Sequence, residues 1–337
     1  MQETTARDRF RQVVRFEPVI DRSPMIEWAA WWDKTLERWK TEGLPKNFSR
    51  EDAIAHFGLD RLDNLTAAGR GPNCPGAPHH GAGIMQDEQG YADIRGCLYC
   101  DETIEAVKTS ASRIKSAHEK GNLIIRFWLD GFFWFPRTLF GIERHMYAFY
   151  DHADLMHRMN SELADFGVRV VEEVFPILTP DMVGFAEDMS YNHGPMISEE
   201  LFDEFLLPYY QRLIPAIKKF DVPVLIDSDG DVTAMIPWMQ RAGIEGVYPL
   251  ERQAGVDVAQ IRQKYPDFIM MGGYDKMVMP HGEEAMRSEF ERLLPVMKSG
   301  GYINSVDHQT PPGVSLENYR SYVELLEEYA VRAAQGA

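Results

Sequence analysis

The regular alternation of short apolar runs with longer amphipathic segments from about residue 100 onward most restricts what this chain can fold into. The runs have the length of strands and the amphipathic segments have the length of helices. The predicted strands are 123–129, 182–186, 222–226, 246–250, 268–271 and 302–305, and the predicted helices are 103–119, 151–176, 198–219, 231–241, 256–264, 282–299 and 315–334. Strands and helices that alternate in this way predict a parallel sheet. With two more strands expected in the first 100 residues, and no glycine-rich dinucleotide loop, the pattern favours a (βα)8 TIM barrel over a doubly wound sheet.

The first 100 residues follow a less regular pattern. Residues 5–16 fit a charged amphipathic helix, and residues 24–28 fit a first strand. Residues 84–94 are expected to form a hairpin around a turn at 87–90. No linker-like stretch divides the chain, and 337 residues, 45% of them hydrophobic, suffice for one large core. We therefore expect a single TIM-barrel domain, 1–337, with an N-terminal helical extension.

Charge and hydropathy narrow the class of partner. A formal charge of −17 argues against binding nucleic acid, whose phosphates would be repelled, and against anionic membrane surfaces. No apolar run reaches the ~18 residues that a membrane span needs. The first ten residues lack the apolar core of a secretory signal. We expect a cytoplasmic protein that acts on a small molecule.

The chain has three cysteines, which do not make a disulfide framework. Cys97 and Cys100 form a Cys-x-x-Cys pair, and Cys74 lies upstream. The spacing fits no paired-cysteine zinc ribbon, and a redox pair should open the helix of a thioredoxin-like unit. We interpret these cysteines as structural or incidental.

A barrel places its functional residues just after the strands. The strand 222–226 is followed at once by Asp227, Asp229 and Asp231, although Asp229 and Asp231 are also suited to cap the next helix. The other predicted strand ends carry Glu27, Asp130, Glu187, Asp188, Glu251, Tyr274, Asp275, Asp307 and His308. Carboxylates that converge in this way imply a metal site or a cationic group on the substrate.

Asp227, Asp229 and His308 form the predicted metal site. Asp227 and Asp229 point to the same side if strand geometry persists past residue 226, and carboxylate and imidazole are ordinary zinc ligands. Glu251 is a further candidate to complete three protein ligands. The alternative is that Asp229 caps a helix and His308 makes a hydrogen bond in the core.

Aromatic side chains gather at the end of the strand 123–129. Such runs either belong to the core or line a pocket for a flat apolar ligand. On the second interpretation the predicted substrate-binding residues are Glu27, Trp28, Phe132, Trp134, Glu187 and Tyr274.

Several stretches resemble the uroporphyrinogen decarboxylase superfamily, over about residues 165–335. They are 184–190 (Gly-Phe-Ala-Glu-Asp-Met-Ser), 194–198, 227–231 (Asp-Ser-Asp-Gly-Asp), 272–276 (Gly-Gly-Tyr-Asp-Lys), 305–308 (Ser-Val-Asp-His) and 311–318. The resemblance implies a barrel and one of three activities: porphyrinogen decarboxylation, cobalamin-independent methionine synthesis, or methyl transfer with a corrinoid protein.

Key residues differ from those of the decarboxylase branch and are closer to those of the methyltransferases. The decarboxylases of this superfamily carry an arginine-rich segment after the first strand, whereas residues 26–33 of this chain read Ile-Glu-Trp-Ala-Ala-Trp-Trp-Asp and contain no arginine. In the zinc methyltransferases a His-x-Cys-Gly and a later Cys align with Asp227, Asp229 and His308. The resemblance implies a methyltransferase with Asp227, His308 and Asp188 as catalytic residues. It also implies zinc, and a corrinoid on a partner protein or tetrahydrofolate as the methyl carrier. A decarboxylase or other lyase acting on a carboxylated ring is the alternative.

Overall fold

A computed structural model describes residues 4–335. Its centre is a curled parallel sheet of seven strands in the order β1-β2-β3-β6-β7-β8-β9. The strands are β1 Leu62–Ala67, β2 Ile124–Asp130, β3 Met182–Ala186, β6 Val224–Asp227, β7 Gly246–Tyr248, β8 Ile269–Tyr274 and β9 Tyr302–Val306, and a short hairpin joins β4 Ser190–Tyr191 to β5 Gly194–Pro195. The prediction of a parallel α/β fold is confirmed.

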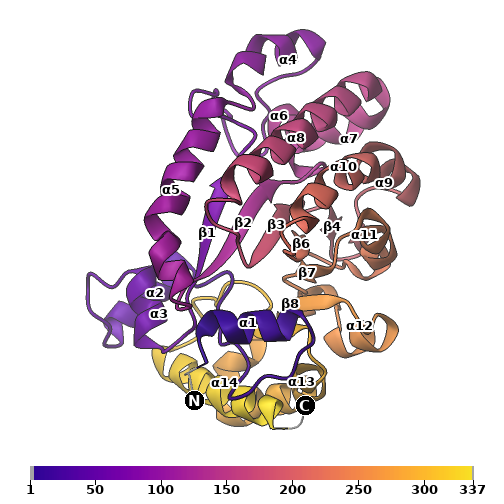
Figure 1. Cartoon of the computed structure of the whole chain (residues 1–337). Coiled ribbons are helices and arrows are strands. Elements are labelled where there is room, and N and C mark those ends of the chain that lie inside the picture. The colour runs from indigo at the N-terminus through magenta and orange to yellow at the C-terminus, as the bar shows by residue number, and fades with distance from the viewer. Residues whose placement is uncertain (1–3, 336–337) are drawn as a thin grey trace.

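Helices follow the strands and surround the sheet (Figure 1). After β1 they are α4 Glu88–Ile94, α5 Asp101–Glu119, α6 Trp134–Phe140, α7 Ile142–Asp151, α8 Ala153–Val174, α9 Glu199–Phe205, α10 Leu207–Lys218, α11 Ile236–Ala242, α12 Val258–Lys264, α13 Glu283–Lys298 and α14 Leu316–Ala334. Before β1 lie α1 Ala6–Val14, α2 Asp33–Thr41 and α3 Arg50–His56, and four 3-10 turns are η1 Arg95–Cys97, η2 Thr233–Met235, η3 Arg252–Ala254 and η4 Lys276–His281. In the described residues, no helix is long and apolar enough to cross a membrane.

The sheet has an apolar cluster on its inner face, separate from the larger core between sheet and helices. The inner cluster contains Ile26, Trp28, Leu62, Ile124, Met182, Leu225, Tyr248, Ile269, Met271 and Ile303, with Ala6, Phe10, Val13 and Val14 of α1. Helix α1 is held at the amino ends of the strands, because Arg7 N donates to Gly121 O at 3.0 Å and Gly301 N donates to Val13 O at 2.8 Å. The predicted N-terminal helix therefore closes one end of the sheet.

The predicted strand 24–28 is not a regular strand. This segment lies between β9 and β1, where Asp60 N donates to Met25 O at 2.7 Å and Trp28 Nε1 donates to Val306 O at 3.0 Å. The sheet therefore has seven strands rather than eight. Strand β1 lies in a stretch that was expected to be irregular.

The predicted hairpin at 84–94 is wrong, because α4 occupies its second half. The residues expected to turn instead start a helix: Asp87 caps α4 by accepting a hydrogen bond from Gly90 N at 2.9 Å. The predicted helix 198–219 is divided into α9 and α10 at Leu206, just before a proline in the first turn of α10.

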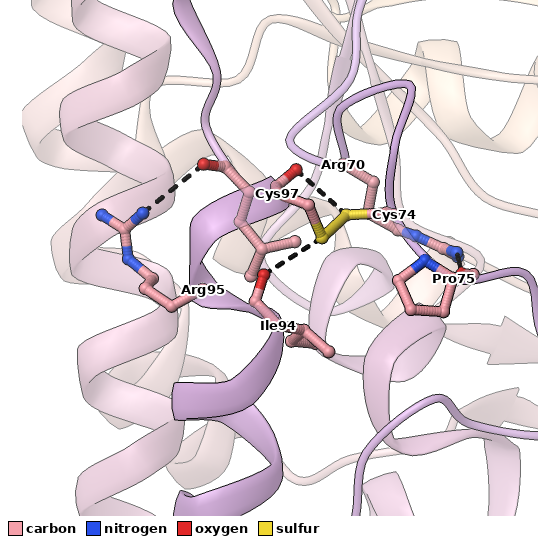
Figure 2. Close-up of a disulfide and its surroundings, with 7 residues drawn as sticks. Arg70, Cys74, Pro75, Ile94, Arg95 and Cys97 are labelled. Atoms are coloured by element: carbon pink, nitrogen blue, oxygen red, sulfur yellow. Dashed lines mark hydrogen bonds between the residues drawn. A yellow bond between two sulfur atoms is a disulfide. The ribbon is translucent and has the colours of Figure 1, made fainter.

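One disulfide joins Cys74, in the loop after β1, to Cys97 in η1 (Figure 2). The Cys74 sulfur also lies 3.0 Å from the carbonyl oxygen of Cys97, and Cys100 is free. The sequence predicted no disulfide framework, and the pattern Cys-x-x-Cys was misleading because the pairing partner is Cys74, 23 positions away from Cys97.

Candidate active site

Three potential metal ligands converge beyond the carboxyl ends of the strands. Asp229 follows β6, Glu251 follows β7 and His308 follows β9, and one ligand atom from each lies within 4.8 Å of the others. His308 Nε2 is 3.8 Å from Asp229 Oδ2. All three side chains are partly exposed. The loops after three different strands thus form one cluster, as a barrel-like sheet predicts.

Local hydrogen bonds hold this cluster in place. Glu251 Oε2 accepts a hydrogen bond from Gly230 N at 2.9 Å, which fixes the loop carrying Asp229 against the loop after β7. Gly230 has φ of +84°, and a Cβ there would lie 2.6 Å from the backbone of Tyr191. Glycine is therefore required at this close approach. The ring of His308 packs edge-on against Trp28, with centroids 5.9 Å apart.

The electrostatics of the cluster suit a cation. The pKa of Asp229 is raised to about 7, first by burial and then by the charges of Asp188 and Glu251, with Lys276 acting in the opposite direction. Burial lowers the pKa of His308, which favours the neutral imidazole that metals bind. Two carboxylates and one imidazole are a donor set that zinc accepts. The residues present fit a metal ion of this kind.

Asp227 is not part of this cluster. It lies at the end of β6, and its backbone oxygen accepts hydrogen bonds from Glu187 N at 2.9 Å and from Asp188 N at 3.2 Å. Burial raises the pKa of its carboxyl well above the usual value, and the nearby Arg126 opposes this. Strand geometry ends at residue 227, so the two-residue period that linked Asp227 to Asp229 does not apply. The cluster contains Glu251 in place of Asp227.

Asp188 lies beside the cluster. Burial raises the pKa of its carboxyl, whereas Arg137, the backbone N–H of Asp229 and His308 lower it. Arg137 also donates from Nη1 to the carbonyl oxygen of Asp188 at 3.1 Å. Asp231 accepts a hydrogen bond from Thr233 N at 3.0 Å just before η2, whose N-cap is Val232, so neither Asp229 nor Asp231 is the N-cap of this turn.

Glu187 is fully buried and holds the start of α6. Its carboxylate accepts hydrogen bonds from the backbone N–H groups of Phe132 at 2.8 Å, Phe133 at 2.8 Å and Trp134 at 2.9 Å, and from the hydroxyl of Tyr210. Burial raises its pKa to about 7. These contacts occupy the carboxylate and hold the start of α6, and a contact of Glu187 with substrate stays a prediction.

The remaining predicted substrate-binding residues lie in different places. Trp28 is on the inner face beside His308, and Trp134 is partly exposed with Arg137 5.1 Å from its ring. Phe132 is core, packed against Tyr210. Glu27 and Tyr274 are buried on the other side of the sheet. The hydroxyl of Ser305 donates to Glu27, and the ring of Tyr274 packs against that of Tyr322 in α14.

The sequence analysis did not single out Arg126 or Arg137. A signal for Arg126 was present, since it is the one charged residue inside the apolar run 123–129. Burying a single cation in a strand is energetically unfavourable, so such a residue indicates a candidate functional position.

Comparisons with known proteins identify a family and a shared fold. The family model described as uroporphyrinogen decarboxylase (URO-D) matches residues 137–329. The uroporphyrinogen decarboxylase of Anaeromyxobacter dehalogenans (strain 2CP-C) is 28% identical over 137 residues, which are 40% of this chain and 38% of that protein. That of Chlorobium limicola is 27% identical over 143 residues, 40% of each chain. The aligned part is thus about two fifths of the length of these curated relatives.

A solved structure with a similar fold is a methyltransferase from Methanosarcina mazei. It superposes with a TM-score of 0.68 at 14% identity, over 97% of this chain and 99% of that one. At this identity the likeness shows a shared fold. The family model covers more than half of the chain, and on that match the protein belongs to the uroporphyrinogen decarboxylase family.

Proposed function

We propose that this protein is a methyltransferase that moves a methyl group between a small methylated compound and a corrinoid protein or tetrahydrofolate. The methylated compound is of the methoxyaromatic or methylamine type. The observation that carries the proposal is the convergence of Asp229, Glu251 and His308 at the carboxyl ends of the strands. Family membership and the fold shared with a methyltransferase support it.

Asp229, Glu251 and His308 would hold zinc, and Asp227 and Asp188 would lie next to the reacting atoms. When bound, zinc supplies a Lewis acid for the heteroatom that carries the methyl group. Asp188, oriented by Arg137 and the backbone of Asp229, would position the substrate. Trp28, packed on His308, would cover one side of the reacting centre and exclude water.

The same residues argue against a porphyrinogen substrate. Asp188, Asp227, Asp229 and Glu251 crowd the mouth and would repel a ligand with many carboxylates. Segment 26–33 has no arginine to offset this repulsion. Any corrinoid would arrive on a partner protein that docks over the mouth, in the cytoplasm. We also assign segment 24–28 to the place of the eighth strand of a (βα)8 barrel.

The test is methyl transfer by the zinc-loaded protein. Methoxyaromatic and methylamine donors are supplied with either reduced corrinoid protein or tetrahydrofolate, and the methylated carrier is quantified. We expect transfer to one carrier from one donor class. Release of CO2 from a porphyrinogen, with no methyl transfer from any donor, would establish the decarboxylase alternative instead.

Variants separate the proposed ligands from their neighbours. Glu251→Gln and His308→Ala should lose stoichiometric zinc, measured by elemental analysis, and lose activity with it. Asp227→Asn should keep zinc and lose activity. Glu324→Gln, an exposed position on α14, is the matched control and should change neither. Zinc that is lost from Asp227→Asn but retained by Glu251→Gln would contradict the ligand set proposed here.

A further inference from the structure

Arg126 is a buried cation that acts on the charge of Asp227 but forms no close ion pair with a carboxylate of the described residues. It lies on β2 and is 4% exposed, and no Asp or Glu oxygen of the described residues lies within 4.0 Å of its guanidinium. Its Nε donates to Asn64 Oδ1 at 2.8 Å, but its Nη1 is buried with no hydrogen-bond partner. Asp227 offsets part of the charge from a distance, but a buried charged donor without a hydrogen bond is costly, so an anion from outside the chain could pair with Nη1.

Aromatic rings surround the guanidinium. Its Cζ lies 4.6 Å from the ring centroid of Trp128, 5.3 Å from that of Tyr248 and 6.0 Å from that of Trp28. The ring faces hold the cation in place through cation–π attraction. The ring faces do not accept a hydrogen bond of ordinary geometry from Nη1, which stays unpaired.

The hydroxyl of Tyr248 lies beside the guanidinium, interacts with it, and has its own proton to donate. It is buried, and its proton has no hydrogen-bond acceptor among the described residues. The facing strand β3 has Gly184 here, and a Cβ at that position would lie 2.3 Å from the Tyr248 hydroxyl and 3.3 Å from Arg126 Cδ. Arg50 adds to the positive potential, since Arg126 lowers the pKa of Arg50 after the larger effect of burial, and Asp63 only partly offsets this.

We propose that Arg126 and Tyr248 form a carboxylate-binding subsite on the inner face of the sheet. Two donors, one on each side chain, match the two oxygens of one carboxylate. A monoanion is favoured over phosphate, because the carboxylates at the mouth oppose a second negative charge. Trp28 contacts both Arg126 and the ring of His308, so it links the subsite to the metal cluster.

This subsite deepens the proposed function and rests on it for the reaction. The methylated substrate is then a flat compound with a carboxylate at one end and the methyl-bearing heteroatom at the other. The carboxylate binds Arg126, the flat part lies against Trp28, and the heteroatom reaches Asp229, Glu251 and His308.

Binding is tested with 4-methoxybenzoate as the probe, on protein without a methyl acceptor, by calorimetry. The uncharged 4-methoxybenzamide and inorganic phosphate are the matched ligands. We expect the benzoate to bind about 10- to 100-fold more tightly than the amide, the range for a charged hydrogen bond, and phosphate not to compete. Arg126→Gln should remove that advantage and leave amide binding unchanged, while Arg113→Gln, exposed on α5, should change neither.

A second variant guards against misfolding. Arg126→Met removes the guanidinium and keeps an apolar side chain against Trp128 and Tyr248, and a single cooperative thermal transition shows that the variant is folded. The probe should raise the melting temperature of the wild type but not that of Arg126→Met.

Three results would each overturn the subsite. They are equal affinity for 4-methoxybenzoate and 4-methoxybenzamide, benzoate affinity that is retained in Arg126→Gln, and competition by phosphate. Probe binding through Arg126 without methyl transfer from any donor would overturn the proposed function and leave the subsite standing. Efficient methyl transfer from uncharged donors alone would overturn the subsite and leave the proposed function standing.

Discussion

Three carboxyls of this protein share a raised pKa of about 7 but have different surroundings. Burial is the largest cause for Glu27, Glu187 and Asp229 alike. Glu187 has backbone N–H donors on both oxygens, whereas Oε1 of Glu27 is buried without a hydrogen-bond partner. Asp229 is partly exposed and faces His308. The environment of each carboxyl, and not its pKa alone, therefore decides its role.

Glu27→Gln should stabilise the protein at neutral and higher pH. The pKa of Glu27 is raised from 4.5 to about 7 in the folded state, so folding binds a proton between these values. The contribution of this carboxyl to the free energy of unfolding is fully present below about pH 4.5 and is lost as the pH rises through 7. The variant should gain about 1–3 kcal/mol in the free energy of unfolding at pH 8 and little at pH 4.5, measured by urea denaturation. An equal change at both pH values would show that the carboxylate charge is not the cause.

Glu187→Gln should have the opposite effect at neutral pH. An amide nitrogen would replace one oxygen that now accepts backbone N–H groups at the start of α6, leaving a buried donor facing donors. We expect a loss of roughly 1–3 kcal/mol in the free energy of unfolding at pH 8. Urea denaturation beside Glu27→Gln makes the comparison, and stabilisation by both substitutions would contradict the roles assigned to the two residues.

Sequence reasoning found the acidic strand ends but could not assign partners to them. Asp229 and His308 were predicted as metal ligands, and the structure places them together. Whether Asp227 or Glu251 joins them depends on where β6 ends and on the Gly230 hydrogen bond. The carboxylate of Glu187 accepts hydrogen bonds from backbone N–H groups at the start of α6, which lie 53 to 55 positions earlier in the chain. A contact over this sequence distance cannot be predicted from local spacing.

The strands of the sheet after residue 100 and most of the long helices were predicted because their apolar periods are strong, whereas α6, α7 and the β4–β5 hairpin were not predicted. Before residue 100, β1 and α4 were not predicted either. Strand β1 reads Leu-Asp-Asn-Leu-Thr-Ala, and its burial is irregular, so it lacks the alternation that marks a strand. In α4, Asp87 and Gly90 suit a turn and a helix start equally, and packing of Tyr91 and Ile94 into the core decides for the helix.

The disulfide between Cys74 and Cys97 ties the loop after β1 to η1, and it can be tested directly. Thiol titration of the denatured, unreduced protein should find one free thiol, from Cys100, and three after reduction. Cys97→Ser should lower the free energy of unfolding by about 3 kcal/mol under oxidising conditions, as expected for a loop of this length.

Cys100→Ser is the control for that experiment and should leave stability nearly unchanged. The difference between wild type and Cys97→Ser should vanish in reductant. Three titratable thiols without reduction would mean that the pair is not oxidised in the isolated protein, as a reducing cytoplasm would favour.

At the scale of the whole molecule, we expect the two ends of the sheet to have different tasks. The candidate active site is made by loops at the carboxyl ends of the strands, and the amino ends are closed by α1 through the inner apolar cluster. In barrels, residues at the carboxyl face act in function and those at the opposite face in stability. The predicted TIM-barrel class implies this division, and it overestimated the regularity of segment 24–28.

Phe10→Ala tests that division. Phe10 is fully buried in the inner cluster from the side of α1, and its loss leaves a cavity that the packed strand ends around it can fill only in part. We expect the free energy of unfolding to fall by about 3–5 kcal/mol, measured by urea denaturation. Zinc stoichiometry and affinity, measured well below the unfolding midpoint, should stay those of the wild type, because the metal cluster is held by its own loop contacts at the far end of the strands. A variant with wild-type stability would mean that α1 does not close the sheet. Zinc binding that is lost while the protein remains folded would mean that the two ends are coupled through the inner cluster, and the division of tasks would fail.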